Sequence, residues 1–396
     1  MNRYQASVLA LALFAATGCS WWRGSPSSGD GPPALEPTTV GAEPAPDLEQ
    51  VEDPAVLNTD ELQAGLRWYL NKDDRPAAEK LTELLNRWGL QPVGDRLPQA
   101  EVDLDGDGTA ELVTALTGAG ANMTGRGALF VIYRQGGNWQ VDRGEEVPGP
   151  ALHGVADLTG DGRPEVIWSS TDAGAHTSFT TLFVSTWKPG QLEMLPGSLS
   201  MAGMELQVDG RDLVLTGGLI NSVGAGPAQR SRTDRYRFDG EQFRLVDRRY
   251  AESPYGYHRL IDGIVAEEFG RTEEARQALR EAAEADRPAL GEGMVPPEWE
   301  DRFAAAVRTY ARVRLALSLP PSDPLARQVL REVTGPYAGL AHAVLGTSGK
   351  EAACQAAAAW AESNPEFLEA LNSPYGYAHP NWLPTNLCGP LPSDGT

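Results

Sequence analysis

The stretch that decides the fold of the central region is Asp103-Leu-Asp105-Gly-Asp107-Gly-Thr109-Ala-Glu111, and it recurs as Asp157-Leu-Thr159-Gly-Asp161-Gly-Arg163-Pro-Glu165. The two copies share one register: positions 1, 3, 5 and 9 carry acidic or hydroxyl side chains, and position 6 is glycine. A run of apolar residues follows each copy directly, which is typical of a β-strand. The repetition indicates a structural unit in which an acidic loop leads into a strand.

The oxygen atoms of these loops predict calcium. Ca²⁺ takes roughly 6–8 oxygen ligands, and alternating acids in a tight loop can supply them. The first loop offers the side chains of Asp103, Asp105, Asp107 and Glu111 with the carbonyl of Thr109, and the second offers those of Asp157, Thr159, Asp161 and Glu165 with the carbonyl of Arg163. Unpaired carboxylates in one short loop repel one another, and a cation relieves that repulsion. We therefore predict structural Ca²⁺ in both loops, bound more tightly in the first, with a metal-free turn as the alternative.

The residues that follow each loop distinguish it from an EF-hand. Position 12 is Thr114 in the first copy and Trp168 in the second, so the bidentate glutamate of that motif is missing. A strand also stands where the motif needs a helix. The pattern instead resembles the FG-GAP and VCBS repeats of integrin-type β-propeller blades. That resemblance implies that the loop leads into a strand and that Ca²⁺ braces the hairpin.

Glycine-containing segments after the apolar strands repeat as well. They read Thr117-Gly-Ala-Gly-Ala-Asn122, Thr171-Asp-Ala-Gly-Ala-His176 and, more weakly, Thr216-Gly-Gly-Leu-Ile-Asn221. We interpret them as three copies of one β unit, near 101–148, 152–200 and 203–250. Asn122, His176 and Asn221 take equivalent places, so units packed side by side would put them on one rim as a possible ligand site. The alternative is that these loops only turn the chain and face water.

Three units are too few for the usual propeller ring, which has about 4–8 blades. We therefore expect a partial-propeller-like domain over residues 99–250, with helices covering its open edges. The predicted fold class is α+β multidomain: a three-unit β-repeat domain flanked by helices, with a C-terminal α-helical domain.

Helical patterns stand before the β region, in a lead-in over residues 53–98. Asn58 is placed to cap one helix, with Glu61 completing a capping box. Asp73 or Asp74 is placed to cap the next helix, with Pro76 in its first turn. One face of that second helix carries apolar side chains at helical spacing, which predicts core packing: Leu81, Leu84, Leu85 and Trp88.

The pattern is helical again over residues 251–396. The spacing there of Gly263, Gly270, Ala275, Leu279 and Ala282 resembles a tetratricopeptide repeat. The resemblance covers one helix pair. It implies two antiparallel helices that approach closely because their contacting residues are small.

The first residues have the pattern of an export signal. Arg3 gives a positive start, and the apolar run Val8–Ala16 is too short to span a bilayer. The following Ala16-Thr-Gly-Cys19 resembles the bacterial lipobox, which implies removal of residues 1–18 and acylation of Cys19. Residues 19–52 are then a lipid-anchored flexible tether, because their composition cannot bury enough apolar area to fold. With Ser20 after the cysteine, the resemblance favours the outer membrane in a cell that has two membranes.

Charge and cysteine content fit a place in the cell envelope, on the periplasmic or outer-surface side. The net charge of −21, from 33 basic and 54 acidic residues, disfavours nucleic acid and anionic lipid as partners. Beyond Cys19, only Cys354 and Cys388 occur, and an oxidising compartment favours one disulfide between them. Two unpaired thiols are the alternative.

No set of residues in the sequence marks a catalytic centre, and none of the five histidines stands in a metal-ligand or nucleophile motif. We expect a binding or scaffold protein that is anchored to the membrane through its N-terminal lipid and has an envelope protein or polysaccharide as its partner. Two alternatives stay open: an envelope glycan hydrolase that uses a pair of the many carboxylates, and a purely structural spacer between envelope layers.

Overall fold

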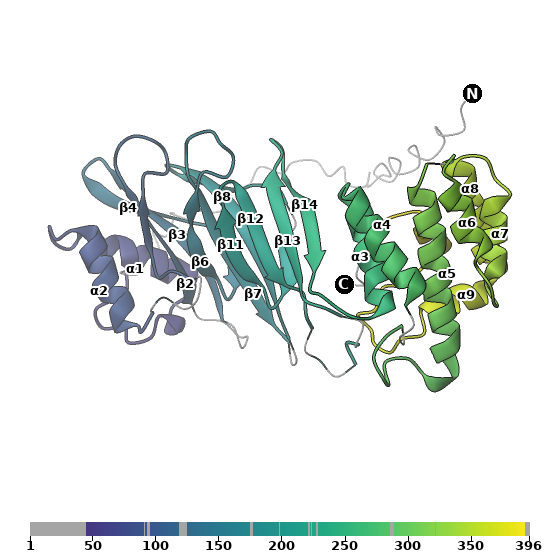
Figure 1. Cartoon of the computed structure of the whole chain (residues 1–396). Coiled ribbons are helices and arrows are strands. Elements are labelled where there is room, and N and C mark those ends of the chain that lie inside the picture. The colour runs from purple at the N-terminus through teal and green to yellow at the C-terminus, as the bar shows by residue number, and fades with distance from the viewer. Residues whose placement is uncertain are drawn as a thin grey trace, which may run out of the picture. The chain divides into compact units, whose positions relative to one another are not determined.

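Three antiparallel sheets occupy the middle of the chain, one for each predicted β unit (Figure 1). The structure is a computed structural model, and it describes residues 45–392 except 91, 93–95, 119–124, 175–176, 198, 221, 223, 227–228, 286–288 and 321. All described residues belong to one compact unit, Ala45–Thr396. The mixed α+β class predicted from the sequence is confirmed.

Each sheet is built around a meander in which consecutive strands pair. The first has β1 (Ala100–Val102), β2 (Glu111–Gly118), β3 (Arg126–Gln135) and β4 (Asn138–Arg143); the second has β6 (Ala151–Ala156), β7 (Glu165–Ala173), β8 (Ser178–Lys188) and β9 (Gln191–Met194); the third has β11 (Glu205–Asp209), β12 (Asp212–Gly217), β13 (Arg232–Phe238) and β14 (Phe243–Tyr250). Two short strands, β5 (Val147–Pro148) and β10 (Leu199–Ala202), also pair with β3 and β8.

The sheets pack face to face through cores that the alternation of strand side chains supplies. Successive side chains of a strand point to opposite faces. In β7, Val166 and Trp168 therefore pack in the core shared with the first sheet, while Ile167 packs in the core shared with the third. In β2, Val113 packs toward the second sheet, whereas Leu112 packs toward the helices before it. Strands buried on both faces explain the nearly continuous apolar runs in the sequence.

The lead-in helices cover the outer face of the first sheet. Helices α1 (Thr59–Asn71) and α2 (Ala77–Arg87) share a core with β2, β3 and β4, and a short 3-10 turn, η1 (Pro54–Val56), precedes them (Figure 1). Leu48 is fully buried in the same core and packs against Gly65. Packed chain therefore begins before residue 53, the boundary expected from composition.

One of the two helix starts in this segment differs from the prediction. The capping box of α1 is confirmed: Asn58 accepts the N–H of Glu61, and Glu61 accepts that of Asn58. In α2, Pro76 stands at the N-cap itself and no side chain caps the helix, so the predicted aspartate cap is wrong. Asp73 instead pairs at 2.8 Å with Lys80, whose ammonium is buried and needs a counter-charge.

The chain after the third sheet is helical. Its elements are α3 (Gly256–Glu268), α4 (Thr272–Glu284), η2 (Pro297–Trp299), α5 (Glu300–Ser318), α6 (Pro324–Arg331), α7 (Ala338–Leu345), α8 (Lys350–Ser363), α9 (Pro365–Leu371) and η3 (Pro384–Leu387). They share one apolar core. Helices α3 and α4 approach so closely that a Cβ on Gly263 would lie 2.6 Å from Cγ of Leu279. Only glycine fits at that crossing.

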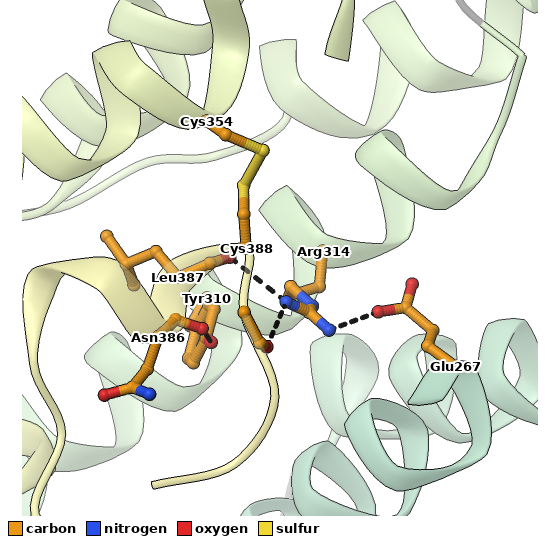
Figure 2. The surroundings of a disulfide bond; sticks show 8 residues. Glu267, Tyr310, Arg314, Cys354, Asn386, Leu387 and Cys388 are labelled. Atoms are coloured by element: carbon orange, nitrogen blue, oxygen red, sulfur yellow. Dashed lines mark hydrogen bonds and ion pairs between the residues drawn. A yellow bond between two sulfur atoms is a disulfide. The ribbon is translucent and has the colours of Figure 1, made fainter. Parts of the chain in front are cut away.

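A disulfide joins α8 to the C-terminal segment (Figure 2). The Cα atoms of Cys354 and Cys388 lie 5.7 Å apart. Beside it, the guanidinium of Arg314 in α5 donates to the carbonyl of Gly389 at 3.0 Å and forms an ion pair with Glu267 of α3. The hydroxyl of Tyr310 donates to the carbonyl of Asn386. The last described residues are thus bound to the helices by covalent, ionic and hydrogen bonds together.

Candidate metal sites

The two acidic loops connect the first and second strands of the first two sheets. Val102 pairs with Glu111 across the first hairpin, and Ala156 pairs with Glu165 across the second. The third sheet has the same hairpin, but there Asp209 pairs with Asp212 and only residues 210–211 remain in the turn. The three sheets therefore share one topology, and only the first two have room for a metal-binding loop.

The aspartate at position 1 holds each loop in shape. The two carboxylate oxygens of Asp103 accept the N–H groups of Gly106 at 2.7 Å and Gly108 at 2.9 Å. Asp157 does the same in the second loop, with the N–H groups of Gly160 at 2.6 Å and Gly162 at 3.1 Å. All four glycines have a positive φ, which L side chains rarely adopt, so the turns depend on glycine at these places.

The glutamate at position 9 lies beneath the loop at the start of the next strand. Glu111 is 3% exposed, and its Oε2 accepts the N–H of Leu104 at 2.8 Å. Glu165 is 1% exposed, and its Oε2 accepts the N–H of Leu158 at 2.7 Å. Thr159 donates its hydroxyl to the other oxygen of Glu165 at 3.0 Å. Each glutamate thus ties the loop to the sheet while keeping an ionisable group out of water.

The structure brings three carboxylates together in each loop. Oxygen atoms of Asp103, Asp105 and Glu111 lie within 4.8 Å of one another, and so do oxygen atoms of Asp157, Asp161 and Glu165. Each group could hold a metal ion. Six of the predicted ligands therefore form two sites, which share loop positions 1 and 9 and differ in the third carboxylate: Asp103, Asp105 and Glu111 in the first, and Asp157, Asp161 and Glu165 in the second.

The other predicted ligands are placed differently. Asp107 is not in the converging group of the first loop, and its Oδ1 accepts the N–H of Thr109 at 2.7 Å. Asp161, at the same position of the second loop, accepts the N–H of Arg163 at 2.8 Å and still belongs to the converging group. Metal binding by the carbonyls of Thr109 and Arg163 and by the hydroxyl of Thr159 stays a prediction.

The glutamates make each loop electrostatically unfavourable without a cation. Burial raises the pKa of Glu111 to about 7, and repulsion from Asp105, Asp107 and Asp103 adds to the effect. Burial also raises the pKa of Glu165, although the N–H groups of Leu158 and Thr159 oppose the rise. A divalent cation among these oxygens would favour the ionised glutamates and remove the repulsion.

The third sheet neutralises the equivalent acid with arginine. Asp212 begins β12 as Glu111 begins β2 and Glu165 begins β7, and it is 3% exposed. Arg237 and Arg235 of the neighbouring strand donate to its carboxylate at 2.6 Å and 2.7 Å. These two guanidinium groups lower the pKa of Asp212 to about 2. A buried acid at this place is therefore paired with arginine in one sheet, whereas in the other two it has no ion-pair partner among the described residues.

An arginine from the following unit packs on each acidic loop, a feature that the sequence did not predict. Arg211, in the turn of the third sheet, donates to the carbonyls of Leu158 and Thr159 in the second loop. A Cβ at Gly160 would collide with that guanidinium. Arg163 of the second loop lies beside Gly106 of the first at a looser contact, with its Nε 3.8 Å from where a Cβ would stand. An arginine of the next unit therefore lies against each loop.

The remaining predicted sites lie outside the described residues. These are Asn122, His176 and Asn221, expected on one rim, and Cys19, expected to carry the lipid. Residues 1–18 of the predicted signal peptide also lie there, with the predicted tether as far as residue 44.

Comparisons with family models, with curated proteins and with solved structures find no match to this chain. Among the helices that the structure describes, none is long and apolar enough to cross a membrane.

Proposed function

We propose that this chain is a lipid-anchored protein of the bacterial cell envelope, and that it acts as a binding or scaffold protein braced by two structural Ca²⁺ ions. The observation that carries the metal part is the contrast between the three sheets. The same buried position is held by Glu111, Glu165 and Asp212, and among the residues that the structure describes only Asp212 forms ion pairs with arginines. In the other two sheets a bound cation would take the place of those guanidinium groups.

The donor set favours calcium over softer metals. Every converging atom is a carboxylate oxygen, with no histidine or cysteine in either group. Oxygen-only sites suit hard cations, and a flexible loop of acids suits Ca²⁺ better than Mg²⁺, which demands a near-octahedral site and keeps its water. The role we assign is structural, because both groups brace the start of a strand that is buried on both faces.

The topology supports the resemblance to FG-GAP and VCBS repeats. Each unit is a four-stranded antiparallel meander, and the loop in question follows its first strand. We propose that the three units form a partial-propeller-like stack. We expect the stack to end at the third sheet, because its outer face carries the charged side chains of Asp212, Arg235 and Arg237. The close approach of α3 and α4 at Gly263 supports a tetratricopeptide-like pair in the helical domain that we propose to follow the stack.

The envelope location rests on the N-terminal sequence, and the disulfide supports it. Disulfides persist in oxidising compartments and are rare in the cytosol, and the bond between Cys354 and Cys388 fits export. Mass spectrometry of the N-terminal peptide of the native protein tests the anchor. We expect acylated Cys19, and a Cys19→Ser chain should leave the membrane fraction.

Calorimetric titration of the full chain with CaCl₂ tests the metal part. We expect two bound ions, with MgCl₂ giving much weaker heats. Partner capture from detergent-solubilised envelopes tests the binding role, with the Cys19→Ser chain as a control for lipid-dependent recovery. Hydrolysis of peptidoglycan or another envelope polysaccharide by the pure protein would instead favour the glycan hydrolase. Altered envelope permeability on deletion, with no recoverable partner, would favour the spacer.

A further inference from the structure

A cleft of about 330 Å³ lies in the helical part, between the end of α5, α6 and the turn from α7 to α8. Ala316, Leu330 and Val344 line it and are buried, while Leu317 and Leu345 are half-buried. The volume is at the lower end of the range of small-molecule sites, roughly 300–1,000 Å³. An apolar chain placed here would cover leucine side chains that water now reaches.

The charged residues of this cleft are all basic. Arg327 and Lys350 line it and are exposed, and neither has an ion-pair partner among the residues that the structure describes. No carboxylate is among the described lining residues, although the chain has 54 acidic and 33 basic residues. The charged cleft beside β14, α3 and α4 is different, because its Arg249 pairs with Glu274.

The N-terminus of α8 adds positive charge at the same end of the cleft. Lys350 is the first residue of this 14-residue helix, and Gly349 before it has no side chain that could cap the first N–H groups. Uncapped N–H groups at a helix start carry partial positive charge and favour anions. The cleft therefore combines an apolar lining with a cationic end.

We propose that this cleft binds one long-chain fatty acid, with its carboxylate near Arg327 and Lys350 and its tail along Leu317 and Leu345. The volume suits a single acyl chain better than the two chains of a phospholipid. The negative net charge of the chain disfavours an anionic membrane surface as a partner, but a single bound molecule responds to the charges beside it. Charges beyond about 10 Å are largely screened at 0.1 M salt.

Calorimetric titration with octanoate, decanoate and dodecanoate, each below its micelle concentration, tests the proposal. The protein is the full chain with Cys19→Ser, so that no lipid of its own can compete for the cleft. We expect one molecule bound per chain, with affinity rising about fourfold per added methylene until the cleft is full. Arg327→Gln and Lys350→Gln should each weaken dodecanoate binding roughly 2–5-fold.

Lys188→Gln is the matched control, because Lys188 is an exposed lysine on β8 and does not line the cleft. It should leave the affinity unchanged. All three substitutions are at exposed positions, so each variant should melt at the temperature of its parent. The proposal is overturned if dodecanoate does not bind, if 1-dodecanol binds equally well, or if both cleft variants keep full affinity. Preferential binding of phosphatidylglycerol vesicles or of a peptide with an apolar C-terminus would overturn it as well.

Discussion

Glu111 and Asp212 occupy the same position of their sheets, yet their carboxylates have opposite electrostatic surroundings. Each is the first residue of the second strand and is almost fully buried. Burial, with repulsion from three aspartates of the loop, raises the pKa of Glu111 to about 7, whereas Arg237 and Arg235 lower the pKa of Asp212 to about 2. At the same position of the sheet, Glu111 would therefore be stabilised by a bound cation, whereas Asp212 already has arginines as its counter-charge.

Calcium should stabilise the protein through both loops. A ligand that binds only the folded state stabilises it by about 2.7 kcal/mol at a concentration of one hundred times its Kd. We expect millimolar CaCl₂ to raise the melting temperature by roughly 5 °C or more over a sample in chelator. Asp103→Ala with Asp157→Ala should abolish the difference. Identical melting curves with calcium and with chelator would favour the metal-free turn.

Glu111→Gln should have opposite effects with and without metal. The glutamine keeps the acceptor for the N–H of Leu104 but carries no charge, so it resembles the protonated form that burial favours. In chelator at pH 8 we expect the free energy of unfolding to rise by roughly 1–3 kcal/mol. In CaCl₂ the variant should lose the stabilisation that Ca²⁺ bound in the first loop gives to the parent.

The control for this experiment is Glu101→Gln, an exposed glutamate on the neighbouring strand β1. It should change the free energy of unfolding by no more than about 0.5 kcal/mol, in chelator and in CaCl₂ alike. Urea unfolding in both buffers gives the comparison. If Glu111→Gln destabilises the protein equally in chelator and in calcium, the glutamate serves only as a hydrogen-bond acceptor and the metal site is not needed.

What could be predicted from the sequence was local. The Asp-Gly spacing of the loops and the apolar runs after them indicate hairpins, and β2 and β7 begin at the predicted Glu111 and Glu165. The first strand of the first unit gave no such signal. Strand β1 is only Ala100–Val102 and is half-exposed, so no alternating apolar pattern marks it.

What could not be predicted depends on how the units stack. The guanidinium of Arg211 reaches the loop at Gly160 only because the third sheet packs on the second. Asp212 finds Arg235 and Arg237 only through the register of β12 with β13. Neither contact has a signature in the spacing of residues along the chain. The neutralised third copy is therefore a tertiary feature, and so is the orientation of the loops toward one another.

Asp212→Asn should reveal the internal counter-charge through its pH dependence. The folded-state pKa of about 2 lies below the ordinary aspartate value of 3.8, so the ion pairs stabilise the fold above about pH 4. That contribution is lost as the pH falls toward 2, because the folded state must then take up a proton as well. We expect the variant to lose about 1–2 kcal/mol at pH 7, given the exposed partner arginines, and the loss to shrink below pH 4.

Asp209→Asn is the control for this prediction, since Asp209 also pairs with Arg235 but is exposed. It should cost less than about 1 kcal/mol. Denaturant unfolding from pH 3 to pH 7 gives the two profiles. If Asp212→Asn lowers the free energy of unfolding by the same amount at pH 3 and at pH 7, the charge of Asp212 is not the cause of the loss.

Gly160→Ala and Gly162→Ala separate backbone strain from the contact with the next unit. Both glycines have a positive φ, so each substitution should cost about 1 kcal/mol of backbone strain. Only at Gly160 would the new Cβ collide with Arg211; nothing lies within 4 Å of one at Gly162. We expect Gly160→Ala to cost about 1 kcal/mol more, because Arg211 must leave its two carbonyls. In an Arg211→Ala background Gly160→Ala should cost no more than Gly162→Ala. If Gly160→Ala costs the same with and without Arg211, the double-mutant cycle shows no coupling and the contact is refuted.

The disulfide should stabilise the helical part by restricting the unfolded chain. Cys354 and Cys388 are 34 residues apart, and loop closure of that length corresponds to about 4 kcal/mol at 25 °C. We expect Cys354→Ser with Cys388→Ser to lower the free energy of unfolding by roughly that amount. A thiol reductant should lower the free energy of unfolding of the parent by the same amount and leave that of the variant unchanged.

Hydrogen exchange tests whether the hydrogen bonds of Arg314 also hold the C-terminal segment. Because Arg314 still holds the carbonyls of Leu387 and Gly389, amides near η3 should stay protected in the Ser variant and lose protection when Arg314→Met is added. If these amides already exchange freely in the Ser variant, the covalent bond alone holds the C-terminal segment.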